Sequence, residues 1–189
     1  MQWGGIITTV VASVRNRKQP ITYRTEIIPV FNREMFSTAG VAARLNLASV
    51  KGGYGDDIPN LFVVKIDVVN GGNHDFQLFK VGLTLSQGDV AVHCDVDTPD
   101  RHHQAKLVTT IGPGAPAPVL DLEFVPLNRQ DLYKFTLYLV VPEGQAAPSE
   151  IGLSSPEPVI FKKSSSAEEM LLTVAKVAIE VGPFRLSVR

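Results

Sequence analysis

The sequence predicts a mainly β protein whose antiparallel strands form a sandwich or barrel, followed by a C-terminal helix. Apolar and polar residues alternate over several short runs, which is the period of a strand with one buried face. Turn signals rich in glycine, proline and asparagine separate nearly all of these runs. No run with helical spacing lies between them, which argues against a parallel α/β sheet.

Residues 62–69 and three later runs show the alternation most clearly. In residues 62–69, four apolar side chains share one face, whereas Lys65 and Asp67 share the other. Shorter signals add further strands. The predicted strands are residues 21–30, 42–50, 62–69, 77–86, 90–97, 105–111, 120–127, 132–141 and 159–162. The predicted inward side chains are Phe62, Val64, Ile66, Val68, Val90, Val92, Cys94, Val96, Leu120, Leu122, Phe124, Tyr133, Phe135, Leu137, Leu139 and Val141.

Composition bounds the class of protein. The chain has 189 residues, of which 44% are hydrophobic and 20% charged, values that suit one globular domain with appendages. A net charge of −1 gives no reason to expect a nucleic-acid partner, because binding to a phosphate backbone requires clustered Lys and Arg. The single cysteine, Cys94, excludes an internal disulfide and favours a reducing compartment.

Residues 3–14 are uncharged and mostly apolar, and a basic cluster of Arg15, Arg17 and Lys18 follows them. Twelve helical residues would rise about 18 Å, whereas a bilayer core is about 30 Å thick. Residues 1–18 are therefore interpreted in two ways: as the end of a truncated membrane anchor, or as an element that packs onto the domain. An anchor would leave the basic cluster and the rest of the chain on the cytoplasmic side.

The run "NGGN" at residues 70–73 separates two alternating segments, and its two glycines suit either a turn or a ligand loop. A glycine loop that cradles phosphate would lead into a helix, but the following residues alternate as a strand. Asn-Gly after an alternating run is a strong turn signal, because both residues tolerate positive φ. We therefore expect a turn between strands.

The C-terminal residues, 164–189, are expected to form a hinge and a helix. Ser166 with Glu169 makes a capping box, and Gly182-Pro183 ends the segment. A terminal strand remains open, because the run "KVAIEV" also alternates with period 2. The expected division is thus residues 1–18, a β domain at 19–163, and the tail at 164–189.

Two stretches resemble motifs of immunoglobulin-like sandwich modules. These are "VVKIDVVNGGNHDFQLFKVGLTL" and "LDLEFVPLNRQDLYKFTLYLV". In the second stretch, Arg129-Gln130 replaces the Pro-Gly of the motif. More narrowly, residues 21–142 are similar to uncharacterised bacterial proteins with an N-terminal membrane helix and one cytoplasmic β-sandwich. The resemblance implies an immunoglobulin-like sandwich at the cytoplasmic side of the membrane. It rests on turn chemistry and implies no reaction.

One stretch, "HCDVDTPDRHH", collects residues of the types that bind metals. Its spacing matches no zinc or calcium pattern, so a solvated strand face that runs into a polar loop is the simpler interpretation. A metal-dependent binder or enzyme using Asp95, Asp97 and His102 is kept as an alternative. The ligand-type residues are His93, Asp95, Asp97, Asp100, His102 and His103.

The other candidate catalytic or binding residues have simpler structural explanations. Cys94 and His93 are adjacent on a strand and point to opposite faces, so they cannot form a dyad. Tyr54 and the pair Asp56-Asp57 lie in a glycine-containing segment that suits a surface turn. The chain has no G-x-S-x-G, Walker or Rossmann motif. We therefore predict no catalytic, cofactor-binding or metal-binding residues.

These observations predict a non-catalytic protein-binding or assembly module without a cofactor. Its partner would be another protein or a second copy of the chain, contacted through sheet edges, loops or the tail. Residues 1–18 would contact the membrane, and the protein would lie at its cytoplasmic side or in the cytoplasm. A membrane-perturbing effector and a self-assembling structural protein are the remaining alternatives.

Overall fold

The computed structural model describes residues 18–38, 45–48 and 54–166. Residues 1–17 and 167–189, where the membrane anchor and the C-terminal helix are expected, lie outside the described parts. No helix in the described parts is long and apolar enough to cross a membrane. The elements are β1 (Gln19–Asn32), α2 (Arg33–Thr38), β2 (Leu45–Ala48), β3 (Tyr54–Ile58), β4 (Asn60–Asn70), β5 (Phe79–Thr84), β6 (Val90–Asp97), β7 (Gln104–Leu107), β8 (Val119–Val125), β9 (Leu132–Val141), β10 (Gly152–Ser154) and β11 (Val159–Lys163).

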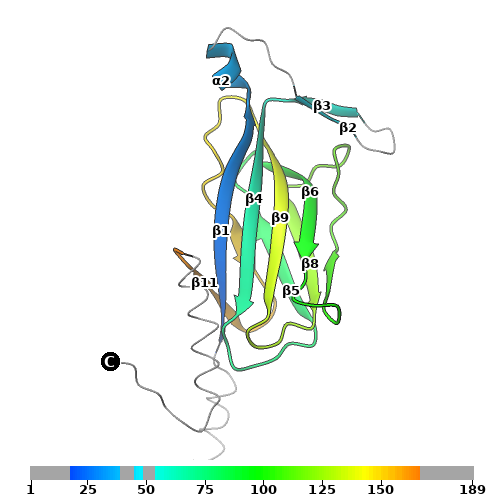
Figure 1. The fold of residues 1–189 in the computed structure, drawn as a ribbon, viewed down its shortest axis with the longest axis vertical. Helices are drawn as coiled ribbons and strands as arrows, with labels where there is room; N and C mark the ends of the chain where they lie inside the picture. The colour runs from blue at the N-terminus through cyan, green and yellow to red at the C-terminus, as the bar shows by residue number, and fades with distance from the viewer. Residues whose placement is uncertain (1–17, 39–44, 49–53, 167–189) are drawn as a thin grey trace, which may run out of the picture.

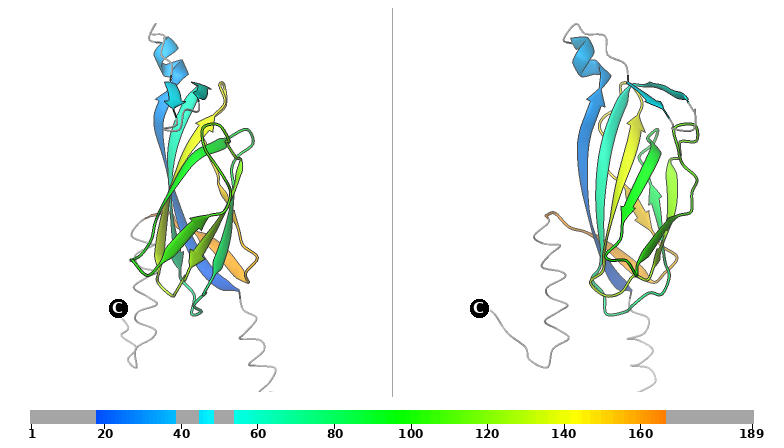
Figure 2. Two further views of the ribbon diagram at one scale, coloured as in Figure 1. Left: turned by 90° about the vertical axis from the view of Figure 1, so that its right-hand side faces the viewer. Right: turned by 45° about the vertical axis from the view of Figure 1, so that its right-hand side comes forward.

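Two sheets face each other across an apolar core, and Figures 1 and 2 show the two layers. One sheet has the strand order β11-β1-β4-β9-β6, and the other has the order β10-β5-β8-β7. A small hairpin of β2 and β3 lies beyond one end of the larger sheet. The prediction of a mainly β protein with largely antiparallel sheets is confirmed.

The core follows the alternation of the sequence. On β4, Val64, Ile66 and Val68 are fully buried. The inward side chains of β9 lie beside them in the same sheet, and those of β8 belong to the opposite sheet of the sandwich. The rings of Phe124 and Tyr133 stack with centroids 4.3 Å apart. Full burial of such apolar side chains stabilises the fold by about 1.5–3 kcal/mol each. The inward faces predicted for residues 62–69, 120–127 and 132–141 are therefore confirmed.

The inward face predicted for residues 90–97 is partly wrong. Ala91 and Val92 are both buried, whereas Val90 is only half-buried. The register of β6 against β9 shifts between Ala91 and His93, which marks a bulge in the ladder. An extra residue at a bulge resets the alternation, so the simple period-2 pattern fails at the start of this strand.

Pairing and short elements also differ from the prediction. β11 pairs in parallel with β1, although antiparallel pairing was expected throughout. β10 is a short strand that was not among the predicted strands. The helix α2 follows β1 directly, where no helix was expected, and its Glu34 N–H donates to the Asn32 side chain at 2.9 Å. Ser164, at the start of the predicted hinge, is 5% exposed and donates its N–H to Tyr23.

The segment at residues 70–73 is a turn between strands, as predicted, but it joins strands of opposite sheets. Asn70 is fully buried, and its amide donates to the carbonyls of His74 at 2.8 Å and Leu127 at 3.2 Å. Its side-chain oxygen accepts the N–H of Gly72 at 3.0 Å. A Cβ on Gly72 would lie 2.7 Å from the side-chain oxygen of Gln19. The close approach of the Gln19 side chain thus favours glycine at position 72. The sequence had suggested a different reason, namely a positive φ.

We expect Asn70→Ala to lower the free energy of unfolding by about 3 kcal/mol, because buried backbone groups lose their partner. Urea unfolding of the full chain measures this change. The matched control is Asn73→Ala in the same turn, where the side chain is exposed and a change within about 0.5 kcal/mol is expected. Equal midpoints for the two variants would contradict the assigned role of Asn70.

Candidate functional site

The predicted metal-type residues separate into two groups in the structure. On the exposed face of β6, His93 Nε2 lies 3.0 Å from Asp95 Oδ1, and both side chains are largely exposed. Arg101 donates to the ring of His102 at 3.2 Å, and among the described residues no hydrogen bond or ion pair joins His102 to Asp95. Within residues 18–38, 45–48 and 54–166, no three His, Cys, Asp or Glu side chains group so as to hold a metal ion.

Cys94 packs partly buried against the core, as expected. Burial and the neighbouring Asp95 raise the pKa of its thiol to about 12. Such a thiol stays protonated at neutral pH, which makes it a poor nucleophile. The backbone of β3 begins at Tyr54, and the side chains of Tyr54, Asp56 and Asp57 lie outside the described parts.

The second group forms a clamp of Asp100, His103 and Asp131, in which the His103 side chain is buried and the Asp100 side chain is exposed. His103 Nδ1 lies 2.7 Å from Asp100, and Nε2 lies 2.7 Å from Asp131. The His103 side chain is 8% exposed. Because a carboxylate faces each ring nitrogen, the geometry suits an imidazolium that donates twice. The clamp ties the loop after β6 to the turn before β9.

The electrostatics of the clamp agree with this geometry. Burial of His103 opposes its protonation, but the hydrogen bonds and charges of Asp100 and Asp131 outweigh burial, so its pKa is raised. The hydrogen bond from His103 and the backbone N–H of His102 lower the pKa of Asp100. Asp131 also accepts the N–H of Asn128 at 2.6 Å. Each side chain of the clamp therefore has hydrogen-bond partners within the protein, which indicates a structural tie.

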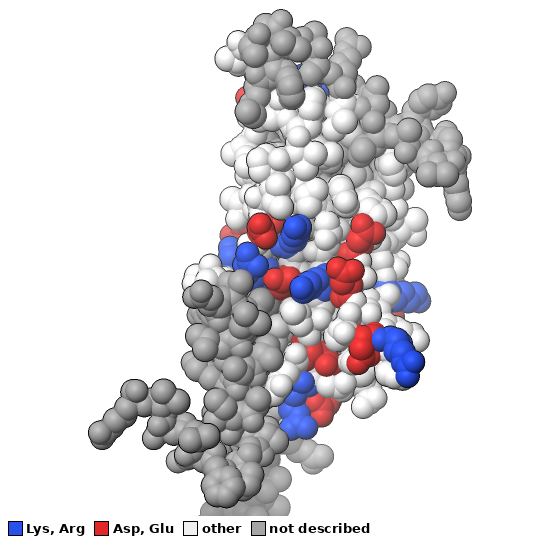
Figure 3. All heavy atoms as spheres, viewed as in Figure 1, with Lys and Arg blue, Asp and Glu red and all other residues white. Residues whose placement is uncertain are grey.

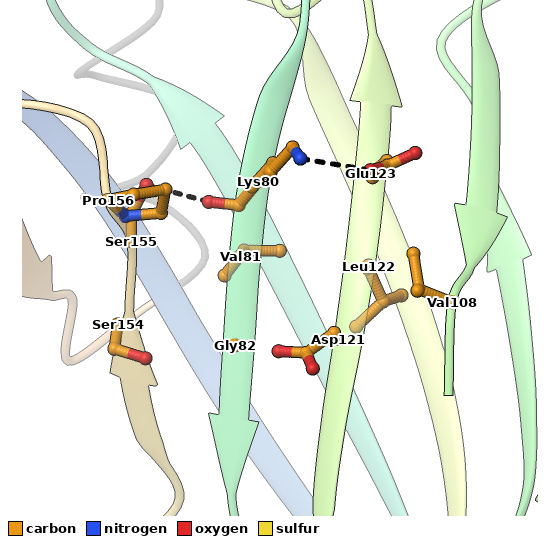
Figure 4. Close-up of a pocket in the computed structure, with 10 residues that line it drawn as sticks. All are labelled: Lys80, Val81, Gly82, Val108, Asp121, Leu122, Glu123, Ser154, Ser155 and Pro156. Atoms are coloured by element: carbon orange, nitrogen blue, oxygen red, sulfur yellow. Dashed lines mark hydrogen bonds and ion pairs between the residues drawn. The ribbon is translucent and has the colours of Figure 1, made fainter. Parts of the chain in front are cut away.

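A groove crosses the outer face of the four-stranded sheet and encloses about 430 Å³ (Figure 4). The register places Gly82 of β5 directly between Asp121 of β8 and Ser154 of β10. The side chains of Lys80 and Glu123 form the next row, and Val108 and Pro156 flank the groove on opposite sides.

Gly82 opens the floor of this groove. A Cβ at this position would lie 2.8 Å from Ser154 Oγ and 3.4 Å from Asp121 Oδ1. Two polar side chains thus converge over a residue that has no side chain of its own. Among the described residues, neither the Asp121 carboxylate nor the Ser154 hydroxyl has a hydrogen bond or an ion pair. By contrast, Lys80 pairs with Glu123 at 3.5 Å, and Ser155 donates to the Lys80 carbonyl at 2.6 Å.

A second hollow, of about 440 Å³, lies beside the clamp and is lined by Asp97, Gln130 and Lys134 among others. Gln130 has φ 70°, a conformation that favours glycine. Its N–H donates to the carbonyl of Asn70 at 2.9 Å, which holds the turn in place. Gln130 stands at the position that is glycine in the motif that the sequence resembles.

The groove was not predicted from the sequence. One signal was available, because Gly82 interrupts the alternating run "FKVGLTL". An isolated glycine within a strand often marks a bulge or a close approach to its backbone. The position of Ser154 opposite Gly82 could not be found in this way, because β10 itself was not predicted.

Comparisons with known proteins identify no family. No family model matches the chain, and no curated protein matches it. Among solved structures, one similar chain is a biomass-sensing module of an RsgI-like protein from Clostridium thermocellum, described as resembling the family 3 carbohydrate-binding module of the cellulosome. It is 8% identical, covers 70% of this chain and 92% of its own, and has a TM-score of 0.25. A likeness this weak says nothing about function.

The clamp predicts that stability depends on pH. The raised pKa of His103 means that its contribution is fully present below its ordinary value of 6.5 and is lost as pH rises through the higher folded value. The lowered pKa of Asp100 acts in the opposite range, since its contribution is lost as pH falls below 3.8. The hydroxyl of nearby Tyr133 stays neutral across this range, because burial and then Asp131 raise its pKa.

We therefore expect His103→Gln to lower the free energy of unfolding by about 2 kcal/mol at pH 6, because charged hydrogen bonds are lost. The variant should also lose the decline in stability that is expected of the natural protein above pH 6.5. Denaturant unfolding over a series of pH values measures both effects. His74→Gln, at an exposed histidine, is the matched control. Parallel pH profiles for the natural protein and His103→Gln would contradict the clamp.

Proposed function

We propose that this protein is a non-catalytic binding module and that its ligand site is the groove over Gly82. The convergence of Asp121 and Ser154 over a strand glycine carries this proposal. Exposed polar groups without partners are free to bind a ligand, whereas groups already paired inside the protein are not. A concave site with a few convergent polar groups and apolar walls is the usual form of a small-ligand site.

Three features support a role without covalent chemistry. The residues that line the groove include neither histidine nor cysteine. Both ring nitrogens of His103 face carboxylates, so this histidine is not free to act as a general base. The raised pKa of Cys94 keeps its thiol protonated. A metal-dependent activity has less support, because the described residues bring no set of metal ligands together.

The immunoglobulin-like topology expected from the resemblance is part of the proposal. The Tyr133 hydroxyl, near the start of β9, donates to the carbonyl of Pro126 at 2.7 Å. This contact is similar to the tyrosine corner of immunoglobulin-like domains, in which a tyrosine near a strand start binds backbone a few residues upstream. It supports the expected topology without any disulfide.

A protein partner or self-association is also proposed. Acidic and basic side chains mix in the lower part of the face shown in Figure 3, over β1, β4 and β9. The register places Ile28, Val63 and Tyr138 in one row across these three strands. A row of half-buried apolar side chains supports contact with a protein more than contact with a polyanion. The effector and self-assembly alternatives rest on the sequence alone.

The groove proposal predicts where small probes bind. We expect at least one of methylammonium, acetate, glucose and N-methylacetamide to shift the backbone amide signals of Gly82, Asp121 and Ser154 in NMR spectra of the full chain. Gly82→Val fills the floor and should weaken this binding about tenfold or more, by about 1.4 kcal/mol. Thr84→Val, also on β5 and outside the groove, is the control. If no probe shifts these amides, the proposed site is wrong.

The membrane part of the proposal rests on residues 1–18 and is tested by flotation. We expect the full chain to float with vesicles of phosphatidylethanolamine and phosphatidylglycerol, because apolar residues insert and the basic cluster meets anionic headgroups. A chain that begins at Gln19 should stay at the bottom of the gradient, and its unfolding curve should show that it is folded. If both chains stay at the bottom, the proposed membrane contact is wrong and the groove proposal is unaffected.

A further inference from the structure

We infer that the groove over Gly82 binds a primary alkylammonium group, an inference that rests on the proposed function of the same groove. The shared chemistry is one compact cation with several N–H donors on an alkyl chain. Such a group occurs in a lysine side chain and in free diamines. The geometry, the charge and the walls of the groove each favour it.

The geometry favours a single nitrogen atom. The place where a side chain of Gly82 would begin lies within 3.4 Å of both Ser154 Oγ and Asp121 Oδ1. The two oxygens are therefore close enough together for one donor atom that lies between them, farther from the backbone than a Cβ, to reach both. An ammonium carries three N–H donors on one atom, whereas a guanidinium distributes its donors over a planar fork. Convergence on one point suits the ammonium.

The charge of the groove favours a cation. Of the two acidic residues in the lining, Glu123 is paired with Lys80 at 3.5 Å. Asp121 has no ion pair within the described parts of the chain, so the lining has one more acidic than basic side chain. A carboxylate accepts hydrogen bonds and donates none, so it selects a ligand that donates. An anionic ligand would meet repulsion at the same place.

The walls favour an alkyl chain. Val108 is 48% exposed, and Pro156 faces it from the opposite side of the groove. A methylene chain that leaves the ammonium can cover this apolar surface, and the removal of apolar surface from water stabilises the complex. No aromatic side chain lines the groove, so hydrogen bonds and ion pairing must hold the cation.

The first experiment titrates the isotope-labelled full chain with butylammonium chloride and with 1-butanol, its neutral analogue. We expect butylammonium to shift the amide signals of Gly82, Asp121 and Ser154, and butanol to bind about tenfold or more weakly. The difference should shrink as salt is added, because salt screens the ion pair. Putrescine and the methylamide of Nα-acetyl-lysine then distinguish a free diamine from a lysine side chain.

Two variants locate the interaction. Asp121→Asn keeps the shape and removes the charge, and it should weaken butylammonium binding about tenfold. Asp97→Asn removes the same charge from an exposed position on β6 and should change nothing. Ser154→Ala should weaken binding less than Asp121→Asn, because it removes a neutral acceptor. Unchanged core amide signals show that each variant is folded.

The outcomes separate the two proposals. Equal binding of butanol and butylammonium, or equal effects of Asp121→Asn and Asp97→Asn, overturns the ammonium inference. If acetate, glucose or N-methylacetamide shifts the Gly82 amide and butylammonium does not, the groove remains a binding site and the inference about its ligand is wrong. If none of these probes reaches the groove, both proposals fail.

Discussion

The pairing of β4 with β9 is the constraint on which the rest of the structure depends. These strands are antiparallel partners from Asn60 opposite Val141 to Val69 opposite Leu132, and they form the centre of the larger sheet. Their inward side chains supply most of one wall of the core. Because side chains alternate with period 2, a slip by one residue would turn this wall to solvent. β1 on one side and β6 on the other take their register from this pair.

Much of this arrangement was predictable from the sequence, because one face of each central strand is buried and the other is not. The alternation of Val64, Ile66 and Val68 with polar residues is enough to identify β4 and its inward face. The direction of pairing is not encoded in such a period, so the parallel partnership of β11 with β1 was missed. The bulge at Ala91 was missed for the same reason, since it depends on how β6 meets β9.

The candidate site was much less predictable, because residues distant in sequence build it. The register of three strands brings Gly82, Asp121 and Ser154 together, and one of these strands has only three residues. The clamp joins His103 to Asp131 across 28 positions of sequence. The sequence indicated His103 as a residue of a metal-binding type. It gave no sign that Asp131, which lies in a turn distant in sequence, would be its second carboxylate partner. The alternation of apolar and polar residues shows which face of a strand is buried. It gives little information about which strands become neighbours in a sheet.

The polar side chains of the end loops and those of the groove differ in whether they have hydrogen-bond partners within the protein. Loops at the end of a β-sandwich commonly bind ligands, yet here buried Asn70 and the His103 clamp tie those loops to each other. Their hydrogen bonds are already made inside the protein, so a ligand would have to break them. On the sheet, the Asp121 carboxylate and the Ser154 hydroxyl are held by paired strands and remain without partners among the described residues. Rigid support with free polar groups favours the groove as the site of recognition.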